Sequence, residues 1–126
     1  MKVFIAALLI LLLLIGGGIA ADLYLHTLSE DIANFADRID QAAQAENFDT
    51  VRAVYQEMQT YWDANEMPLT ALVDHAHTVE IDKSLKELEM SMAVEEDTEI
   101  LLSCAKVRME VKSIANDEHF HIKNIL

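Results

Sequence analysis

The stretch LHTLSEDIANFADRIDQA (residues 25–42) carries the clearest structural signal in this chain. Its apolar side chains recur at spacings of three and four residues, which is the period of one face of an α-helix. The members of this apolar seam are Leu25, Leu28, Ile32, Phe35, Ile39 and Ala42. The stretch therefore predicts an amphipathic helix. Its heptad-like spacing suits either packing inside a helical bundle or dimerisation.

A long apolar run precedes this helix. Val3–Ala21 contains no charged residue. At about 1.5 Å per residue, a helix of this length spans roughly 28 Å, close to the thickness of a bilayer's hydrocarbon core. We therefore expect residues 1–21 to form a transmembrane anchor that crosses the membrane with residues 3–21. A signal peptide cleaved after Ala20 is the alternative, because small residues precede that bond.

The distribution of charge indicates an orientation and excludes one class of partner. Lys2 is the only basic residue before the apolar run, whereas residues 22–126 hold eight Lys and Arg against 22 Asp and Glu. Basic residues tend to stay in the cytoplasm. We expect a single-pass protein of the cell membrane with a cytoplasmic N-terminus and an extracytoplasmic domain over residues 22–126. The acidic charge of that domain argues against nucleic-acid binding.

The composition of residues 22–126 predicts an all-α fold. This part of the chain has no glycine and a single proline, so the turn residues that β-rich folds need are missing. Residues that favour helices are abundant. Short connections would make neighbouring helices antiparallel. We expect an antiparallel up-down bundle of four helices after the anchor, or of three if the first helix only extends the anchor.

The ends of the helices are predicted from capping residues. Thr27-Leu28-Ser29-Glu30 matches a capping box, so a new helix could begin at Thr27, or the anchor could run straight into the seam. The remaining signals place helix boundaries along the rest of the chain. They predict that the first helix ends near Glu46-Asn47 and that the second begins with an N-cap at Asp49 and stops at Pro68. The third helix is predicted from about Leu69 to Met92, and the fourth begins with an N-cap at Asp97 or Thr98.

Several stretches resemble a family of short bacterial proteins known as domain of unknown function 4363. The resemblance rests on Val54–Trp62, on Leu72-Val73-Asp74-His75 followed by Ile81-Asp82, and on Asn124-Ile125-Leu126. It covers essentially the whole chain. It implies one N-terminal anchor followed by a small helical domain, and it implies no assigned biochemical activity.

Two tetrapeptides hold four of the five histidines. They are Asp74-His75-Ala76-His77 and Glu118-His119-Phe120-His121, and the fifth histidine is His26. On a helix, residues i and i+3 share a face but residues i and i+2 do not. This spacing selects Asp74 with His77 and Glu118 with His121 as ligands for zinc, manganese or iron between two facing helices. The favoured interpretation is nevertheless that the histidines are solvated or structural, and metal binding and pH-sensitive histidines at an interface are the alternatives.

No catalytic motif accompanies these residues, and the domain has no glycine-rich loop for phosphate. Cys104 lies in an apolar stretch, which favours a buried structural thiol over an intermolecular disulfide. We expect a non-enzymatic accessory or interaction protein of the bacterial cell envelope that needs no cofactor. Its partner would be another membrane or envelope protein, or an identical chain. The alternative is a metal-binding bundle that uses the four ligands above.

Overall fold

The computed structural model describes residues 1–125 and, among these, the side chains of residues 1–116. The all-α prediction is confirmed, since this part of the chain contains four helices and no strand. The helices are α1 (Lys2–Gln44), α2 (Phe48–Thr70), α3 (His75–Val94) and α4 (Asp97–Ile125). Short turns join them, so each helix runs antiparallel to the one before it.

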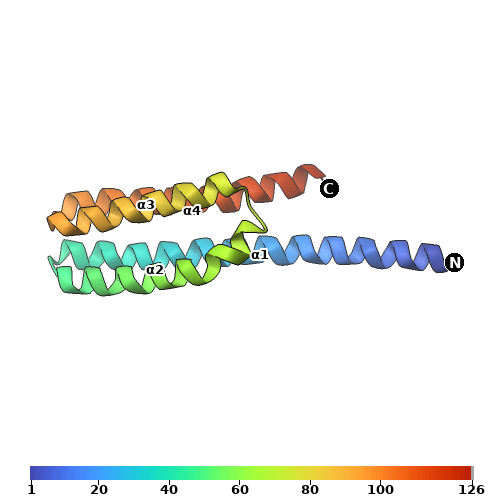
Figure 1. The fold of residues 1–126 in the computed structure, drawn as a ribbon, viewed down its shortest axis with the longest axis horizontal. Helices are drawn as coiled ribbons and strands as arrows, with labels where there is room; N and C mark the ends of the chain where they lie inside the picture. Colours follow the sequence, from blue (N-terminus) through green and yellow to red (C-terminus); the bar gives the residue numbers. More distant parts are fainter. Residues whose placement is uncertain (126) are drawn as a thin grey trace.

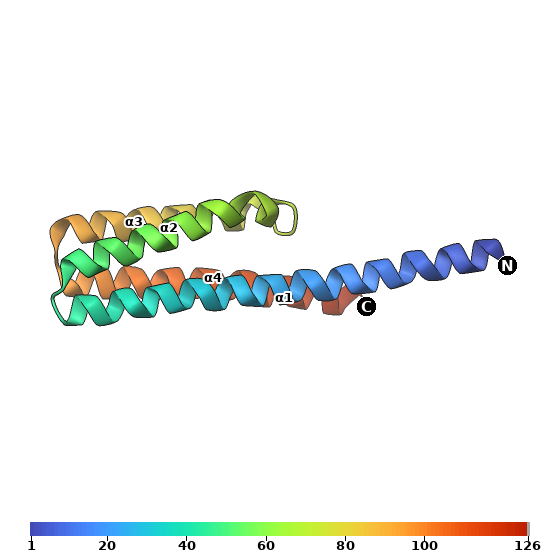
Figure 2. The ribbon, with the colours of Figure 1, turned by 90° about the horizontal axis from the view of Figure 1, so that it is seen from below.

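The helices form an up-down-up-down bundle from which the first half of α1 projects (Figure 1). α1 and α3 each pack on both α2 and α4, whereas diagonally opposite helices make no contact within the described residues. The predicted four-helix arrangement is therefore confirmed. We call the end from which α1 projects the proximal end. The α2–α3 turn lies there, and the other two turns lie at the distal end (Figure 2).

α1 is one unbroken helix with two kinds of surroundings. None of the first 24 residues is buried, and Leu25 is the first buried side chain. The capping box at Thr27 does not begin a new helix, because no proline interrupts the i→i−4 hydrogen bonds that continue from the apolar run. α1 therefore both extends the apolar run and serves as the first helix of the bundle.

The core is built from one apolar seam on each helix. In α1 the predicted seam is buried apart from Phe35, which is only partly buried beside the fully buried Ala36. The other three helices contribute side chains with little or no exposed surface. These include Val51, Met58 and Trp62 of α2, Ile81, Leu85 and Leu88 of α3, and Ile100, Cys104, Val107 and Val111 of α4. Burying such side chains is the main favourable term in folding.

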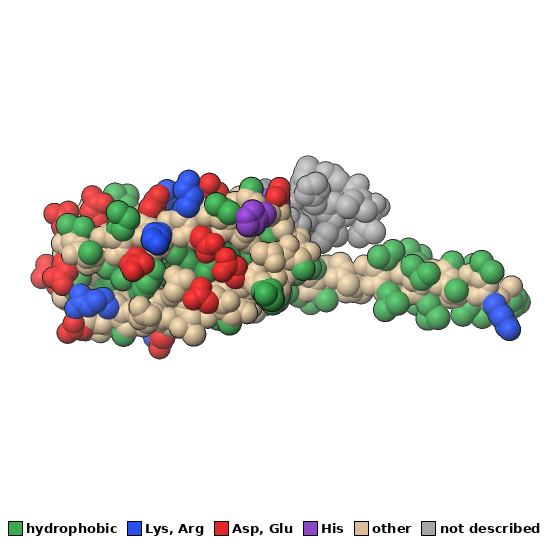
Figure 3. Space-filling model, viewed as in Figure 1, with side chains coloured by type: hydrophobic (Ala, Val, Ile, Leu, Met, Phe, Trp, Pro, Cys, Tyr) green, Lys and Arg blue, Asp and Glu red, His purple; other side chains and the backbone are tan. Residues whose placement is uncertain are grey.

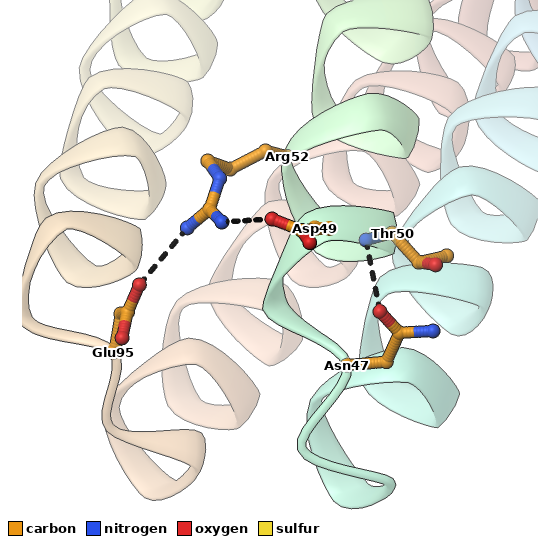
Figure 4. A network of polar contacts seen from close by, with 5 residues as sticks. All are labelled: Asn47, Asp49, Thr50, Arg52 and Glu95. Carbon is orange, nitrogen blue, oxygen red and sulfur yellow. Dashed lines mark hydrogen bonds and ion pairs between the residues drawn. The ribbon is translucent and has the colours of Figure 1, made fainter.

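The start of α2 differs from the prediction. Asn47, rather than Asp49, is the N-cap, and its side-chain oxygen accepts a hydrogen bond from the backbone N–H of Thr50 at 3.3 Å. Asp49 lies in the first turn of α2 and pairs with Arg52, whose guanidinium also reaches Glu95 at 3.1 Å (Figure 4). An acid in the first turn still favours the positive end of the helix dipole.

The prediction that Pro68 stops the second helix is wrong. α2 continues through Thr70, and Leu69 is fully buried. Pro68 lacks the N–H that would donate to the carbonyl of residue 64, and the burial of Leu69 favours continuation of the helix despite this loss. The third helix consequently begins at His75, not near Leu69, and Asp74 is its N-cap.

The start of α4 is also one or two residues earlier than predicted. Asp97 lies inside the first turn of α4 and is not a cap ahead of it. Its carboxylate accepts a hydrogen bond from the backbone N–H of Thr98 at 2.8 Å. Because Asp97 and Glu99 both lie in the first turn, this end of α4 has favourable charges for its dipole.

Both distal turns contain a non-glycine residue in the left-handed region. Glu46 follows α1 with φ of 56°, and Glu95 follows α3 with φ of 54°. Glycine is the usual residue at this position because a Cβ atom makes the conformation unfavourable by roughly 1–2 kcal/mol. The distal turns therefore form without the residue type that they would favour.

We predict that Glu46→Gly stabilises the protein by about 0.5–1 kcal/mol, because relief of the left-handed strain exceeds the added entropy of the unfolded chain. Urea unfolding of the full chain in detergent, followed by circular dichroism, measures the difference. The neighbouring Ala45, with φ of −82°, supplies the control, and Ala45→Gly should lower the free energy of unfolding. Equal effects of the two substitutions would show that the conformation of Glu46 is not strained.

Candidate functional site

The proximal end holds the histidines that the structure describes. His75 and His77 lie in the first turn of α3, and His26 lies on α1 near the point where its side chains become buried. His26 and His75 are exposed, and His77 is half-buried. His119 and His121 have side chains outside the described residues.

The structure changes the geometry assumed for one half of the predicted metal set. Asp74 has an extended backbone (φ −62°, ψ 138°) and precedes α3, so Asp74 and His77 are not an i, i+3 pair within a helix. The Asp74 carboxylate accepts a hydrogen bond from the backbone N–H of Ala76 at 3.3 Å. The side chains of Glu118 and His121 are outside the described residues.

No group of three or more His, Cys, Asp and Glu side chains is placed to hold a metal ion among residues 1–116. The set Asp74, His77, Glu118 and His121, with zinc, manganese or iron, stays a prediction.

Aromatic side chains make directional hydrogen bonds between helices near the proximal end. Tyr24 of α1 donates to the Asn65 side chain of α2 at 2.8 Å, and Tyr61 of α2 donates to the Asp31 carboxylate of α1 at 2.7 Å. Trp62 of α2 donates its indole N–H to the Asp82 carboxylate of α3 at 2.7 Å. We call these three hydrogen bonds the aromatic clasps.

The clasps give Trp62 a second role beside its place in the core. Trp62 is fully buried, as expected for a core anchor, but its indole N–H also needs a partner. That partner, Asp82, belongs to a stretch that carries the family resemblance, and so does Trp62. The sequence signal for this hydrogen bond is the acidic residue Asp82, which directly follows the apolar residue Ile81.

Burial and nearby acids change the acidity of the tyrosines. Burial, followed by the negative charge of Glu89, raises the pKa of Tyr55 to about 12. The Tyr55 hydroxyl donates to the backbone oxygen of Leu85 at 3.3 Å. Burial and the hydrogen bond to Asp31 also raise the pKa of Tyr61. Both hydroxyls therefore stay protonated at neutral pH and act as hydrogen-bond donors.

Three acidic side chains, those of Asp63, Glu66 and Asp82, lie near one another beside the Trp62 clasp. The hydrogen bond with Asp82 is the largest cause of a raised pKa at Glu66, and partial burial and the charge of Asp63 add to it, whereas His75 opposes it. Glu66 and Asp63 come from α2, and Asp82 comes from α3. A proton held between the carboxyls of Glu66 and Asp82 would join these two helices.

The prediction of a buried thiol at Cys104 is confirmed, since this side chain has no exposed surface. Burial, followed by the negative charge of Asp40, raises the pKa of the thiol. Asp40 accepts a hydrogen bond from Arg108 at 2.7 Å, and Arg108 also reaches Asp37 at 3.2 Å. These contacts tie α4 to α1. A neutral, buried thiol is a poor nucleophile.

The hollows described on the surface are open to solvent, as on the face in Figure 3, and their linings combine exposed side chains with partly buried or buried ones such as Tyr55. One example lies between α2 and α3, over residues that take part in structural contacts. Its lining residues are Tyr55, Gln56, Gln59, Asp82, Lys86 and Glu89. The polar groups at this place hold helices together, and the arrangement can bind a surface more readily than it can enclose a small molecule.

These features define a class of protein: an antiparallel four-helix bundle whose first helix continues into a segment long and apolar enough to cross a membrane. Residues 19–125 match the family described as Domain of unknown function (DUF4363), and the chain belongs to that family. No curated protein and no solved structure matched the chain.

We predict that Glu66 makes the stability of the bundle depend on pH. Because its pKa is raised on folding, its contribution is fully present below the ordinary pKa of a glutamate and is lost as pH rises through the raised value. Glu66→Gln should therefore gain thermal stability relative to the parent as pH rises from about 4.5 to 7. Melting temperatures across this range measure the difference.

Glu96→Gln, in the exposed turn before α4, is the control for the loss of a carboxylate outside the contact with Asp82. Parallel curves for Glu66→Gln and the parent would contradict the proton shared with Asp82.

We predict that Cys104 reacts with a maleimide at least about a hundredfold more slowly than an exposed thiol, because reaction requires the bundle to open. The comparison is the double variant Cys104→Ala, Thr60→Cys, since Thr60 is exposed on α2. Labelling is followed by mass spectrometry with and without guanidinium. Rapid labelling of Cys104 in the folded protein would show that α4 leaves the core readily.

Proposed function

We propose that this chain is a single-pass, membrane-anchored protein of the bacterial cell envelope that binds another protein and has no catalytic role. Residues 3–21 would cross the membrane with the N-terminus in the cytoplasm, and the bundle would stand on the extracytoplasmic side. Two observations support the anchor: the apolar part of α1 is long and apolar enough to cross a membrane, and none of it is buried in the bundle. Lys2, before this segment, supports the orientation.

One observation carries the interaction role: apolar side chains form a line on the outward face of α3. They are Val79, Met90 and Val94, and Met90 is 67% exposed. At 100° per residue, these three positions fall within an arc of about 60°. On α4, Leu102 and Met109 are also exposed and lie one heptad apart. We call the three α3 residues the α3 line.

The surroundings of the α3 line agree with a protein partner. Lys83 and Lys86 lie between Val79 and Met90 on the same outward side of α3, and Lys83 pairs with Glu80 at 3.8 Å. The chain as a whole carries a net charge of −13. An apolar line with basic residues beside it suits a partner helix that presents apolar and acidic side chains. That partner would be another membrane or envelope protein, or an identical chain whose own acidic surface supplies the complementary charge.

The test places a photoreactive phenylalanine at Met90 in the full chain and cross-links it in native membranes. We expect a discrete adduct from position 90 that is lost when Val79→Glu and Val94→Glu are added, because charges on the α3 line would oppose docking. Position 60, exposed on α2, is the matched control and should give no such adduct.

The mass of the adduct separates a second copy of the chain from a different protein. The proposal is overturned if position 90 gives no adduct above that from position 60, or if the two glutamates leave the adduct unchanged.

A further inference from the structure

The α2–α3 turn lies level with the end of the apolar segment. The hydrogen bond between Tyr24 and Asn65 sets the register of α2 against α1. With a rise of about 1.5 Å per residue, Met67 lies about 3 Å and Thr70 about 7.5 Å beyond this level, and Ala21 lies about 4.5 Å beyond it. The turn therefore reaches the level at which the apolar segment ends, as the two ribbon views also show (Figures 1 and 2).

We include the last four residues of α2 in the α2–α3 turn, which then covers residues 67–74 (MPLTALVD). Some of its apolar side chains lie in the core and others are exposed. Leu69 and Val73 are buried, and they fasten the turn to the bundle. Met67 is 83% exposed and Leu72 is 39% exposed. Exposed apolar side chains on a turn that is itself well fastened are available to contact an apolar environment.

The backbone of the turn is already hydrogen-bonded within the protein. The N–H groups of Ala71, Leu72 and Val73 donate to the carbonyl oxygens of Pro68 and Leu69 at 2.9–3.3 Å. The Thr70 hydroxyl donates to the backbone oxygen of Met67 at 2.7 Å. Unpaired backbone groups make entry of a turn into a lipid surface unfavourable, and in this turn the N–H donors of residues 71–73 are paired.

The distal turns have the opposite character. Residues 45–49 contain two acids and residues 95–99 contain four, whereas residues 67–74 contain only Asp74. The Asp74 carboxylate is engaged as the N-cap of α3. The two distal turns thus present acids, whereas residues 67–74 at the proximal end present apolar side chains.

From this placement we propose that the α2–α3 turn rests in the headgroup region of the membrane that holds the apolar segment, with Met67 and Leu72 inserted among the lipids. The inference rests on the proposed anchor, because α1 is what holds the turn at the membrane surface. An amphipathic surface of this kind gains free energy when its apolar side chains leave water.

The test uses the full chain with Cys104→Ala, reconstituted into phosphatidylcholine vesicles, with one added cysteine that carries an environment-sensitive fluorophore. Met67→Cys and Leu72→Cys are the test positions. We expect blue-shifted emission from both, and quenching by phosphatidylcholine that carries a nitroxide near its headgroup. Thr50→Cys, exposed at the distal end of α2 and outside the α3 line, is the control and should emit as in water, without quenching.

A fourth position, Leu13→Cys, reports on the anchor alone. Because it lies near the middle of residues 3–21, roughly 12–15 Å from either end, its quencher is phosphatidylcholine that carries the nitroxide deep in an acyl chain. The inference is overturned if position 13 is quenched by this lipid but positions 67 and 72 emit like position 50. If position 13 is itself unquenched, the anchor of the proposed function fails and the inference fails with it. Quenching at 67, 72 and 13 but not at 50 supports the inference, and it requires no protein partner because the vesicles contain lipid alone.

Discussion

The unbroken backbone of α1 is the constraint on which the rest of the structure depends. Sharp bends in helices occur at prolines, at glycine or serine pairs and at bulges, and between Ala21 and Gln44 α1 contains neither proline nor glycine. Its first part exposes apolar side chains all round, and its second part exposes one face and buries the other. The remaining three helices have to pack around the second part only, so the place of the first buried residue, Leu25, sets where the bundle can begin.

Apolar seams bring the four helices together, but the polar contacts between them fix the register. A seam of similar aliphatic side chains could slide by one turn with a small loss of packing. Such a shift would break the aromatic clasps between α2 and its neighbours, and it would separate Arg108 from Asp40. A buried donor such as the Trp62 indole N–H would then be left without its acceptor, at a cost of about 1–3 kcal/mol.

Sequence periodicity predicted the seam of α1, and composition predicted the all-α fold, because both signals extend over many residues and a single misplaced residue hardly changes them. The ends of the helices depend on single residues and were harder to predict. Asn47 and Asp49 are both good caps, and only the path of the chain decides between them. Pro68 fails to end α2 because burial of Leu69 favours one more turn. Asp74 was assigned to a metal on the assumption that it was helical, which its extended backbone contradicts.

The stiffness of α1 also gives the bundle a fixed reach. From Ala21 to Gln44 the helix rises about 35 Å, so the distal turns stand at that height above the end of the apolar segment. If this segment tilts by about 20°, which is common for membrane helices, the distal turns swing sideways by about 12 Å. The position of a protein bound near the acidic distal turns would therefore change with the tilt of the apolar segment.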